Sequence, residues 1–199
     1  MDPNPAPRKH KVIFDAFNVL DGFSNLLAYG DSVNAYDVNI GLLADVIADK
    51  DINEVEVAAI SVHLGVCDST LHPTRHASEM ARIRKWERDS RVKVHARPSW
   101  FNEFTGAYEE KGVDTAMALD LCMSQASGQY DKITVFTADS DMLPALEHAY
   151  DASGAGVDLA RWVGQPSRLW LPGRKLWCHY LDAADLARCV TRRNNRSAA

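Results

Sequence analysis

Short apolar runs alternate along the chain with longer segments in which apolar residues recur every three or four positions. The runs have the length of buried strands, and the recurring pattern is typical of amphipathic helices. The predicted strands cover residues 11–15, 55–64, 92–95, 134–137, 156–163 and 176–181. The predicted helices cover residues 36–49, 73–89, 112–124, 142–153 and 183–190. This alternation predicts an α/β fold of three layers, in which a mainly parallel central sheet carries helices on both faces.

The two ends of the chain lack this pattern. Residues 1–10 are polar and rich in proline, so we expect a flexible tail there. Residues 191–199 form a second, basic tail. Residues 11–190 are then one folded domain, and 199 residues are enough for a sizeable core.

Composition narrows the class of protein. Hydrophobic and charged fractions of 46% and 25% are ordinary for a soluble globular chain. No run is long enough to span a membrane, and the first residues are no signal peptide, so a cytoplasmic protein without a membrane partner is expected. The four cysteines form no CxxC pair, which favours reduced thiols over disulfides or a zinc site. A net charge of −5 argues against nonspecific binding of nucleic acid by the whole surface, but it is compatible with a local basic face. Homo-oligomerisation is left open.

Acidic residues follow the first and the fourth predicted strands. Asp15 ends the first apolar run, and Asp139 and Asp141 follow the fourth. Because the carboxyl ends of parallel strands share one edge of a sheet, where ligands bind, these acids converge if the two strands are neighbours. Such a group is costly unless a cation faces it. The alternative is that Ser140 or Asp141 only caps the next helix, which explains one residue but not both acids.

Another acid lies at the start of the helix predicted at 112–124. Asp114 shares a helical face with Met117 and Leu121 and so points towards a packed side. A carboxylate aimed inward is costly without a partner, which suggests a fourth member of the acidic group. A first-turn acid facing the helix dipole is an equally good alternative. Glu110 is a weaker candidate, because an acid in a loop is readily solvated.

These acids belong to three motifs, namely Asp15-x-x-Asn18, Lys111-Gly112-Val113-Asp114 and Asp139-Ser140-Asp141. Their order, their spacing and the apolar strand before the first and last motifs resemble the NYN domain, a branch of the PIN-like nucleases. The resemblance covers essentially the whole folded chain, from residue 11 to residue 190. Ala16 and Ala138 stand where this family often has glycine.

The resemblance implies a PIN-like (Rossmannoid) fold and cleavage of RNA with Mg²⁺ or Mn²⁺. The implied metal ligands are Asp15, Asp114, Asp139 and Asp141, and Asn18 would help to shape the catalytic site. The residue chemistry agrees, because Mg²⁺ prefers oxygen ligands and can activate a water and stabilise charge on a phosphate. His72 and His76 have the spacing of a metal pair, but Pro73 places His72 before the helix.

A basic stretch supplies candidates for RNA contact. Residues 75–97 hold eight basic and three acidic side chains. On the predicted helix, Arg82, Lys85 and Arg88 lie opposite the apolar side and are assigned to RNA phosphates. A solvated helix face is an equally weighted alternative. Ser140 and Lys111 are assigned to RNA contact as well.

Aromatic residues are unusually frequent in the predicted loop at 98–108. Trp100, Phe101 and Phe104 have the chemistry to stack on unpaired bases. The alternative, which is commoner for aromatic side chains in loops, is packing beneath the loop.

We therefore expect a metal-dependent endoribonuclease. The competing hypothesis is a non-catalytic module that binds RNA or a protein partner with the same fold. Retention of all four aspartates favours the enzyme. A phosphatase of the haloacid dehalogenase type is disfavoured, because that chemistry needs an acid two residues after Asp15, where Phe17 stands.

Overall fold

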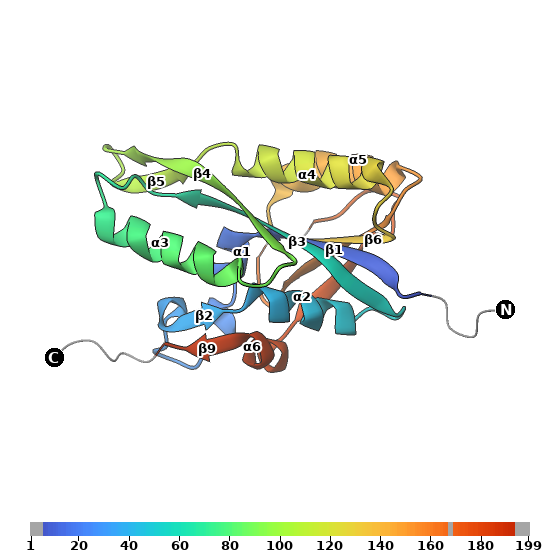
Figure 1. The fold of residues 1–199 in the computed structure, drawn as a ribbon, viewed down its shortest axis with the longest axis horizontal. Coiled ribbons are helices and arrows are strands. Elements are labelled where there is room, and N and C mark those ends of the chain that lie inside the picture. Colours follow the sequence, from blue (N-terminus) through green and yellow to red (C-terminus); the bar gives the residue numbers. More distant parts are fainter. Residues whose placement is uncertain (1–5, 167–168, 194–199) are drawn as a thin grey trace.

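The computed structural model describes residues 6–166 and 169–193 of the 199-residue chain. Its main feature is a seven-stranded sheet in the order β5-β4-β3-β1-β6-β7-β8 (Figure 1). All neighbouring strands run parallel except β4 and β5. The strands are β1 (Arg8–Asp15), β3 (Val55–Val66), β4 (Val92–Asn102), β5 (Ala107–Glu110), β6 (Lys132–Phe136), β7 (Gly156–Trp162) and β8 (Trp177–Leu181).

Helices cover both faces of this sheet. They are α1 (Ala16–Asp21), α2 (Ile40–Asp49), α3 (Pro73–Trp86), α4 (Val113–Ser127), α5 (Leu143–Asp151) and α6 (Ala183–Cys189). Figure 1 shows α4 and α5 on one face, with α1, α2, α3 and α6 on the other. The predicted three-layer α/β arrangement with a mainly parallel sheet is confirmed at this level.

Strand β1 shows why both faces are covered. Val12 and Phe14 pack into the cluster with α1, α2, α3 and α6, whereas Ile13 packs into the cluster with α4 and α5. All three side chains are fully buried. Because successive side chains of a strand point to opposite faces, an unbroken apolar run is what a central strand of a three-layer fold requires.

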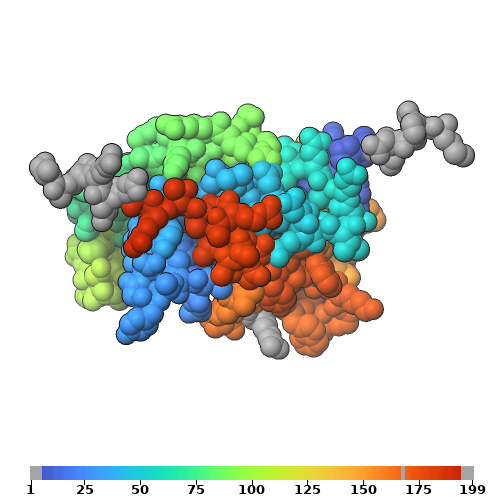
Figure 2. Space-filling view, turned by 90° about the horizontal axis from the view of Figure 1, so that it is seen from below, coloured from blue at the N-terminus to red at the C-terminus, as the bar shows by residue number. Residues whose placement is uncertain are grey.

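The smaller elements correct the predicted domain ends. Strand β2 (Tyr36–Val38) pairs antiparallel with β9 (Val190–Arg192), and Figure 2 shows the C-terminal segment lying across the early part of the chain. The basic tail predicted at 191–199 is therefore wrong for its first residues. The N-terminal tail predicted at 1–10 is also too long, because β1 already begins at Arg8. The rest of both predicted tails, apart from residues 6, 7 and 193, lies outside the described residues.

Two predicted boundaries shift for identifiable reasons. The helix predicted from residue 36 begins at Ile40, because the Asn39 side chain accepts a hydrogen bond from the Leu42 amide and caps it. The aromatic loop predicted at 98–108 is mostly a hairpin made by the end of β4 and by β5. Period-two alternation was hidden there by adjacent aromatic residues.

A short 3₁₀ helix, η3 (Ser140–Met142), links the end of β6 to α5. Two others, η1 (Ser24–Leu26) and η2 (Val33–Ala35), lie between α1 and β2. Within the part of the chain that the structure describes, no helix is both long and apolar enough to cross a membrane. All four cysteines are free, with Cys67 and Cys189 buried.

Candidate functional site

The strand order reverses between β1 and β6. From β1 the chain builds outward through β3, β4 and β5, and it then returns to add β6, β7 and β8 on the other side of β1. Phe14 of β1 pairs with Phe136 of β6, so Asp15 and the segment that holds Asp139 lie at neighbouring strand ends. Ligands bind at such switch points in open α/β sheets. The first and third motifs therefore meet as predicted.

Asp15 is both buried and hydrogen-bonded. Its carboxylate is the N-cap of α1 and accepts hydrogen bonds from the amide and the side chain of Asn18. Thr137 Oγ1 lies 3.5 Å from Asp15 Oδ2. Burial raises the pKa of Asp15 despite the hydrogen bonds from Asn18, and Asp114 raises it further. The carboxylate is thus held in one orientation at an electrostatic cost, which a nearby cation would relieve.

Asn18 joins the two strand ends. While its Nδ2 donates to Asp15, its Oδ1 accepts a hydrogen bond from the Ala138 amide at 3.2 Å. Gln165 holds Asn18 from the far side, since Gln165 Nε2 lies 3.2 Å from the Asn18 carbonyl oxygen. Gln165 follows β7 and is itself fixed by a hydrogen bond from the Trp162 amide. No sequence motif pointed to Gln165, because its role depends on the loop after β7 folding back.

The third motif combines capping with an acidic cluster. Asp139 is the N-cap of η3, and its Oδ1 accepts a hydrogen bond from the Asp141 amide at 2.9 Å. The capping alternative is thus realised, but by Asp139 rather than by Ser140 or Asp141. One Asp139 oxygen is used in this way, and Asp141 is exposed. Capping therefore accounts for the position of Asp139, while Asp141 is an exposed acid in the first turn of η3.

Asp114 completes the predicted group from a third element. It lies half-buried in the first turn of α4. Burial raises its pKa, and the negative charges of Asp139 and Asp141 raise it further. The second motif therefore does lie within electrostatic reach of the third, and through Asp15 it is coupled to the first.

Glu110, at the end of β5, is a stronger member of this group than the sequence suggested. Its Oε1 accepts a hydrogen bond from the Gly65 amide at the end of β3. Desolvation raises the pKa of Glu110, and so do Asp15 and Asp114. Glu110 is still exposed, as an acid in a loop would be, but its hydrogen bond with Gly65 could not be predicted because β5 was predicted as a loop.

The predicted metal ligands are spread along the rim rather than gathered at one point. Among the described residues, three candidate ligand atoms lie within 4.8 Å of one another in two other groups, and not in this one. These two groups are His63 with His95 and Asp120, and Asp51 with Asp158 and His179. A hydrated Mg²⁺ ion, which keeps several waters and is held through one or two carboxylates, suits the wider spacing at the rim.

Two hollows flank the rim. A cleft of about 860 Å³ lies between α1 and α3 and includes Glu110 in its wall. A pocket of about 490 Å³ is lined by Asn18, Asp139 and Ser140. Phe17 and Asp21 of α1 line both. Phe17 is 62% exposed, so an aromatic ring stands between the two hollows.

The basic residues predicted to contact RNA differ in whether their side chains are free to bind a phosphate. Arg82 is half-buried in the wall of the large cleft, together with Arg75 and Arg193. No hydrogen bond or ion pair of Arg82 is found among the described side chains, whereas Arg75 pairs with Glu79. Burial and the charge of Arg193 lower the pKa of Arg82. Arg82 thus faces the cleft rather than the outer helix face on which it was predicted.

Of the other predicted RNA contacts, Lys85 and Arg88 are less favourably placed than Arg82. Lys85 is paired with Asp37 of β2 at 3.1 Å. Arg88 is exposed but lies beyond the end of α3, because the helix stops at Trp86 rather than at residue 89. Lys111 is exposed at the rim, and Ser140 lines the smaller pocket.

Ala16 and Ala138, which stand where the NYN family often has glycine, fit without backbone strain. Ala16 begins α1 and Ala138 follows β6, and no non-glycine residue in the described ranges has a positive φ. The turns at the ends of β1 and β6 therefore do not need glycine in this chain.

Comparison with known proteins identifies the fold alone. No protein-family model matches the chain, and no curated protein matches it. A solved structure, that of a protein of unknown function from Vibrio parahaemolyticus, is similar with a TM-score of 0.56 and 14% sequence identity. The alignment covers 90% of this chain and 96% of the other. At this identity the likeness is one of architecture, so function depends on the geometry of the rim.

Proposed function

We propose that this protein is a PIN-like endoribonuclease of the NYN type, which cleaves RNA phosphodiester bonds with Mg²⁺ or Mn²⁺ held at the acidic rim. The observation that supports the proposal most is the electrostatic coupling of the motifs. Burial is the largest cause of the raised pKa values of Asp15 and Asp114; Asp114 adds to the first, and Asp139 and Asp141 add to the second. Carboxylates from three separate motifs that oppose each other's ionisation are a favourable site for a shared cation.

Each rim residue has a role in this proposal. Asp15, which Asn18 and Thr137 orient, offers the most fixed carboxylate for an inner ligand. Asp114, Asp139 and Asp141 would bind the ion directly or through its waters. The bound ion would supply a water of lowered pKa and stabilise charge on the scissile phosphate. The residues of the chain position that ion and hold the substrate beside it.

The large cleft is a suitable path for the RNA strand. Its charged wall residues are balanced, with Arg75, Arg82 and Arg193 against Asp21, Glu79 and Glu110. A dication bound at the rim would offset part of the negative charge of the rim acids beside this cleft, so RNA binding and metal binding should reinforce each other. Phe17 offers a face on which an unpaired base could stack between the cleft and the smaller pocket.

One observation favours the competing hypothesis, a module that binds RNA without cleaving it. Asp15 and Asp139 each use an oxygen as a helix cap, and the rim acids are not drawn together tightly. Such a protein would bind RNA independently of metal ions and would tolerate amides in place of the acids.

A cleavage assay separates the two. Purified protein is incubated with end-labelled single-stranded RNA in Mg²⁺, in Mn²⁺ or in chelator, while binding is measured in parallel. Cleavage that requires metal, together with binding, supports the nuclease. Binding without cleavage under every condition supports the module.

A further inference from the structure

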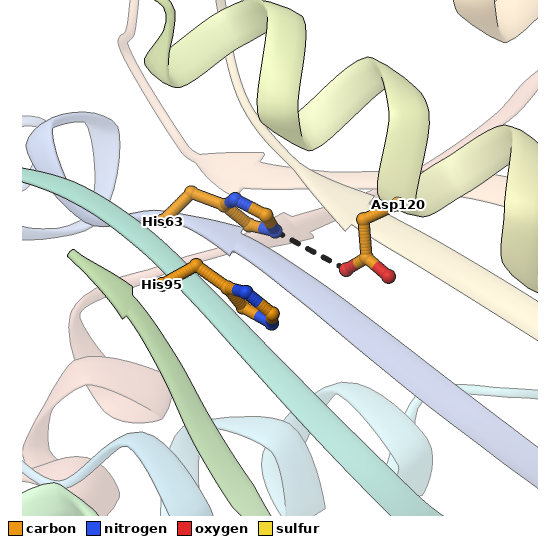
Figure 3. A group of neighbouring side chains, drawn as sticks. All are labelled: His63, His95 and Asp120. Atoms are coloured by element: carbon orange, nitrogen blue, oxygen red, sulfur yellow. Dashed lines mark hydrogen bonds and ion pairs between the residues drawn. The ribbon is translucent and has the colours of Figure 1, made fainter. Parts of the chain in front are cut away.

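Two histidines and an aspartate meet on the face of the sheet beneath α4, deeper than the acidic rim. His63 of β3 and His95 of β4 are register partners. Their rings are stacked, with centroids 4.7 Å apart and planes within 7° of each other. Figure 3 shows Asp120 reaching down from α4 beside the same edges of both rings. One ligand atom from each residue lies within 4.8 Å of the other two.

We propose that His63, His95 and Asp120 form a binding site for a transition-metal ion of the zinc class. Imidazole nitrogen and carboxylate oxygen are ligands that Zn²⁺ takes at about 2.0–2.2 Å, so small inward movements of three side chains would complete a three-ligand site. Mg²⁺ is the wrong ion here, because it prefers oxygen donors alone. The site is separate from the rim and does not rest on the proposed nuclease activity.

The two imidazoles differ in how the structure holds them. His95 is half-buried, and in the described part of the chain its ring makes no hydrogen bond (Figure 3). The His63 side chain is 2% exposed, and its Nδ1 is buried without a partner. A metal ion bound through His63 Nε2 would replace the hydrogen bond to Asp120 Oδ2, while the buried Nδ1 would stay as it is. What the ion would add is a partner for the stacked His95 ring, which has none among the described side chains.

Lys11 defines how the ion would be held. Its Nζ lies 2.6 Å from Asp120 Oδ1 and 2.8 Å from Ser124 Oγ. His63 Nε2 lies 3.1 Å from the other oxygen, Oδ2. Oδ2 would therefore bind the ion, while Lys11 holds Oδ1 as an outer partner that fixes the carboxylate. The ammonium group also repels the ion, so Lys11 weakens the site that it orients.

The other group of three, Asp51 with Asp158 and His179, does not make the same case. The Lys132 ammonium lies 2.7 Å from Asp51 and also pairs with Asp158 on the oxygen that His179 contacts. Here the lysine occupies the position of a cation. In the proposed site the lysine and the histidine lie on different oxygens of the aspartate.

Cobalt spectroscopy tests the proposal. Co²⁺ is titrated into the purified, metal-free protein while its visible absorption is recorded. The parent and Asp139→Asn should develop the same nitrogen/oxygen-ligand bands, because the rim is not involved. His95→Ala should lose them, whereas His148→Ala, which removes an exposed imidazole of α5, should keep them. In the parent, Asp139→Asn and His148→Ala, which are expected to bind Co²⁺, Zn²⁺ should displace the Co²⁺ and raise the melting temperature.

Other outcomes overturn the proposal. These are the absence of bands in the parent, bands that persist unchanged in His95→Ala, or bands that disappear in Asp139→Asn instead.

Discussion

The Asn18 side chain is bonded to Asp15 on one side and to the Ala138 amide on the other, so one residue fixes the ends of the two strands that form the crevice. Asn18→Ala removes a donor to a buried carboxylate and the acceptor of a backbone amide. We predict a loss of about 1–3 kcal/mol in the free energy of unfolding. The loss should shrink as the pH falls and Asp15 becomes protonated, because the donor stabilises the charged form. Urea unfolding at several pH values measures it.

A matched control is available in Asn25→Ala. Asn25 is an exposed asparagine whose Nδ2 donates at 3.3 Å to the Gly164 carbonyl, and its loss should cost well under 1 kcal/mol. Equal losses in the two variants would mean that Asn18 does not link the strand ends as described.

The raised pKa of Asp114 predicts a pH-dependent stability. Burial and the nearby acids raise this pKa above its ordinary value of 3.8, so the folded state binds more protons than the unfolded state between the two values. Stability therefore falls as the pH rises through that window and stays lower above it. In chelator, Asp114→Asn should be more stable than the parent at pH 7 and indistinguishable from it at pH 3. A stability difference that is the same at both pH values would contradict the coupling.

Arg82 should contribute more to RNA binding than Arg88. Arg82→Gln removes a cation from the cleft wall, whereas Arg88→Gln removes an equal charge beyond the end of α3. Each lost phosphate contact reduces the slope of log affinity against log salt by about 0.7 for single strands. We expect this change for Arg82→Gln and a near-parental slope for Arg88→Gln, measured by fluorescence anisotropy in chelator. The reverse order would place the RNA on the outer face of α3.

Regular patterns and strand-end acids could be predicted from the sequence, while contacts between distant loops could not. The unbroken apolar run at 11–15 identified a central strand, and Asp15 and Asp139 at strand ends located the rim. The hairpin at 98–110 was missed because its adjacent aromatic residues obscure the alternation. Gln165 was missed because only the folded chain brings the loop after β7 against Asn18.

The apolar periodicity of α3 could predict which side of the helix is buried but not what faces its polar side. Periodicity separated Arg82 from the apolar side of α3, but it contains no information on what lies across from the helix. Only the packed structure shows that Arg82 faces a cleft and that Lys85 meets Asp37.

Metal-dependent RNA cleavage by Asp15→Asn is the most direct test of the proposed function. The substitution nearly preserves side-chain volume but removes the negative charge of the best-oriented carboxylate at the rim. Asp49→Asn, a change in an exposed ion pair with Arg188, serves as the matched control. The account predicts that parent and Asp49→Asn cleave single-stranded RNA in Mg²⁺ or Mn²⁺ and not in chelator, while Asp15→Asn is slower by orders of magnitude with RNA binding retained. Cleavage by Asp15→Asn at the parental rate, or cleavage by the parent in excess chelator, would contradict it.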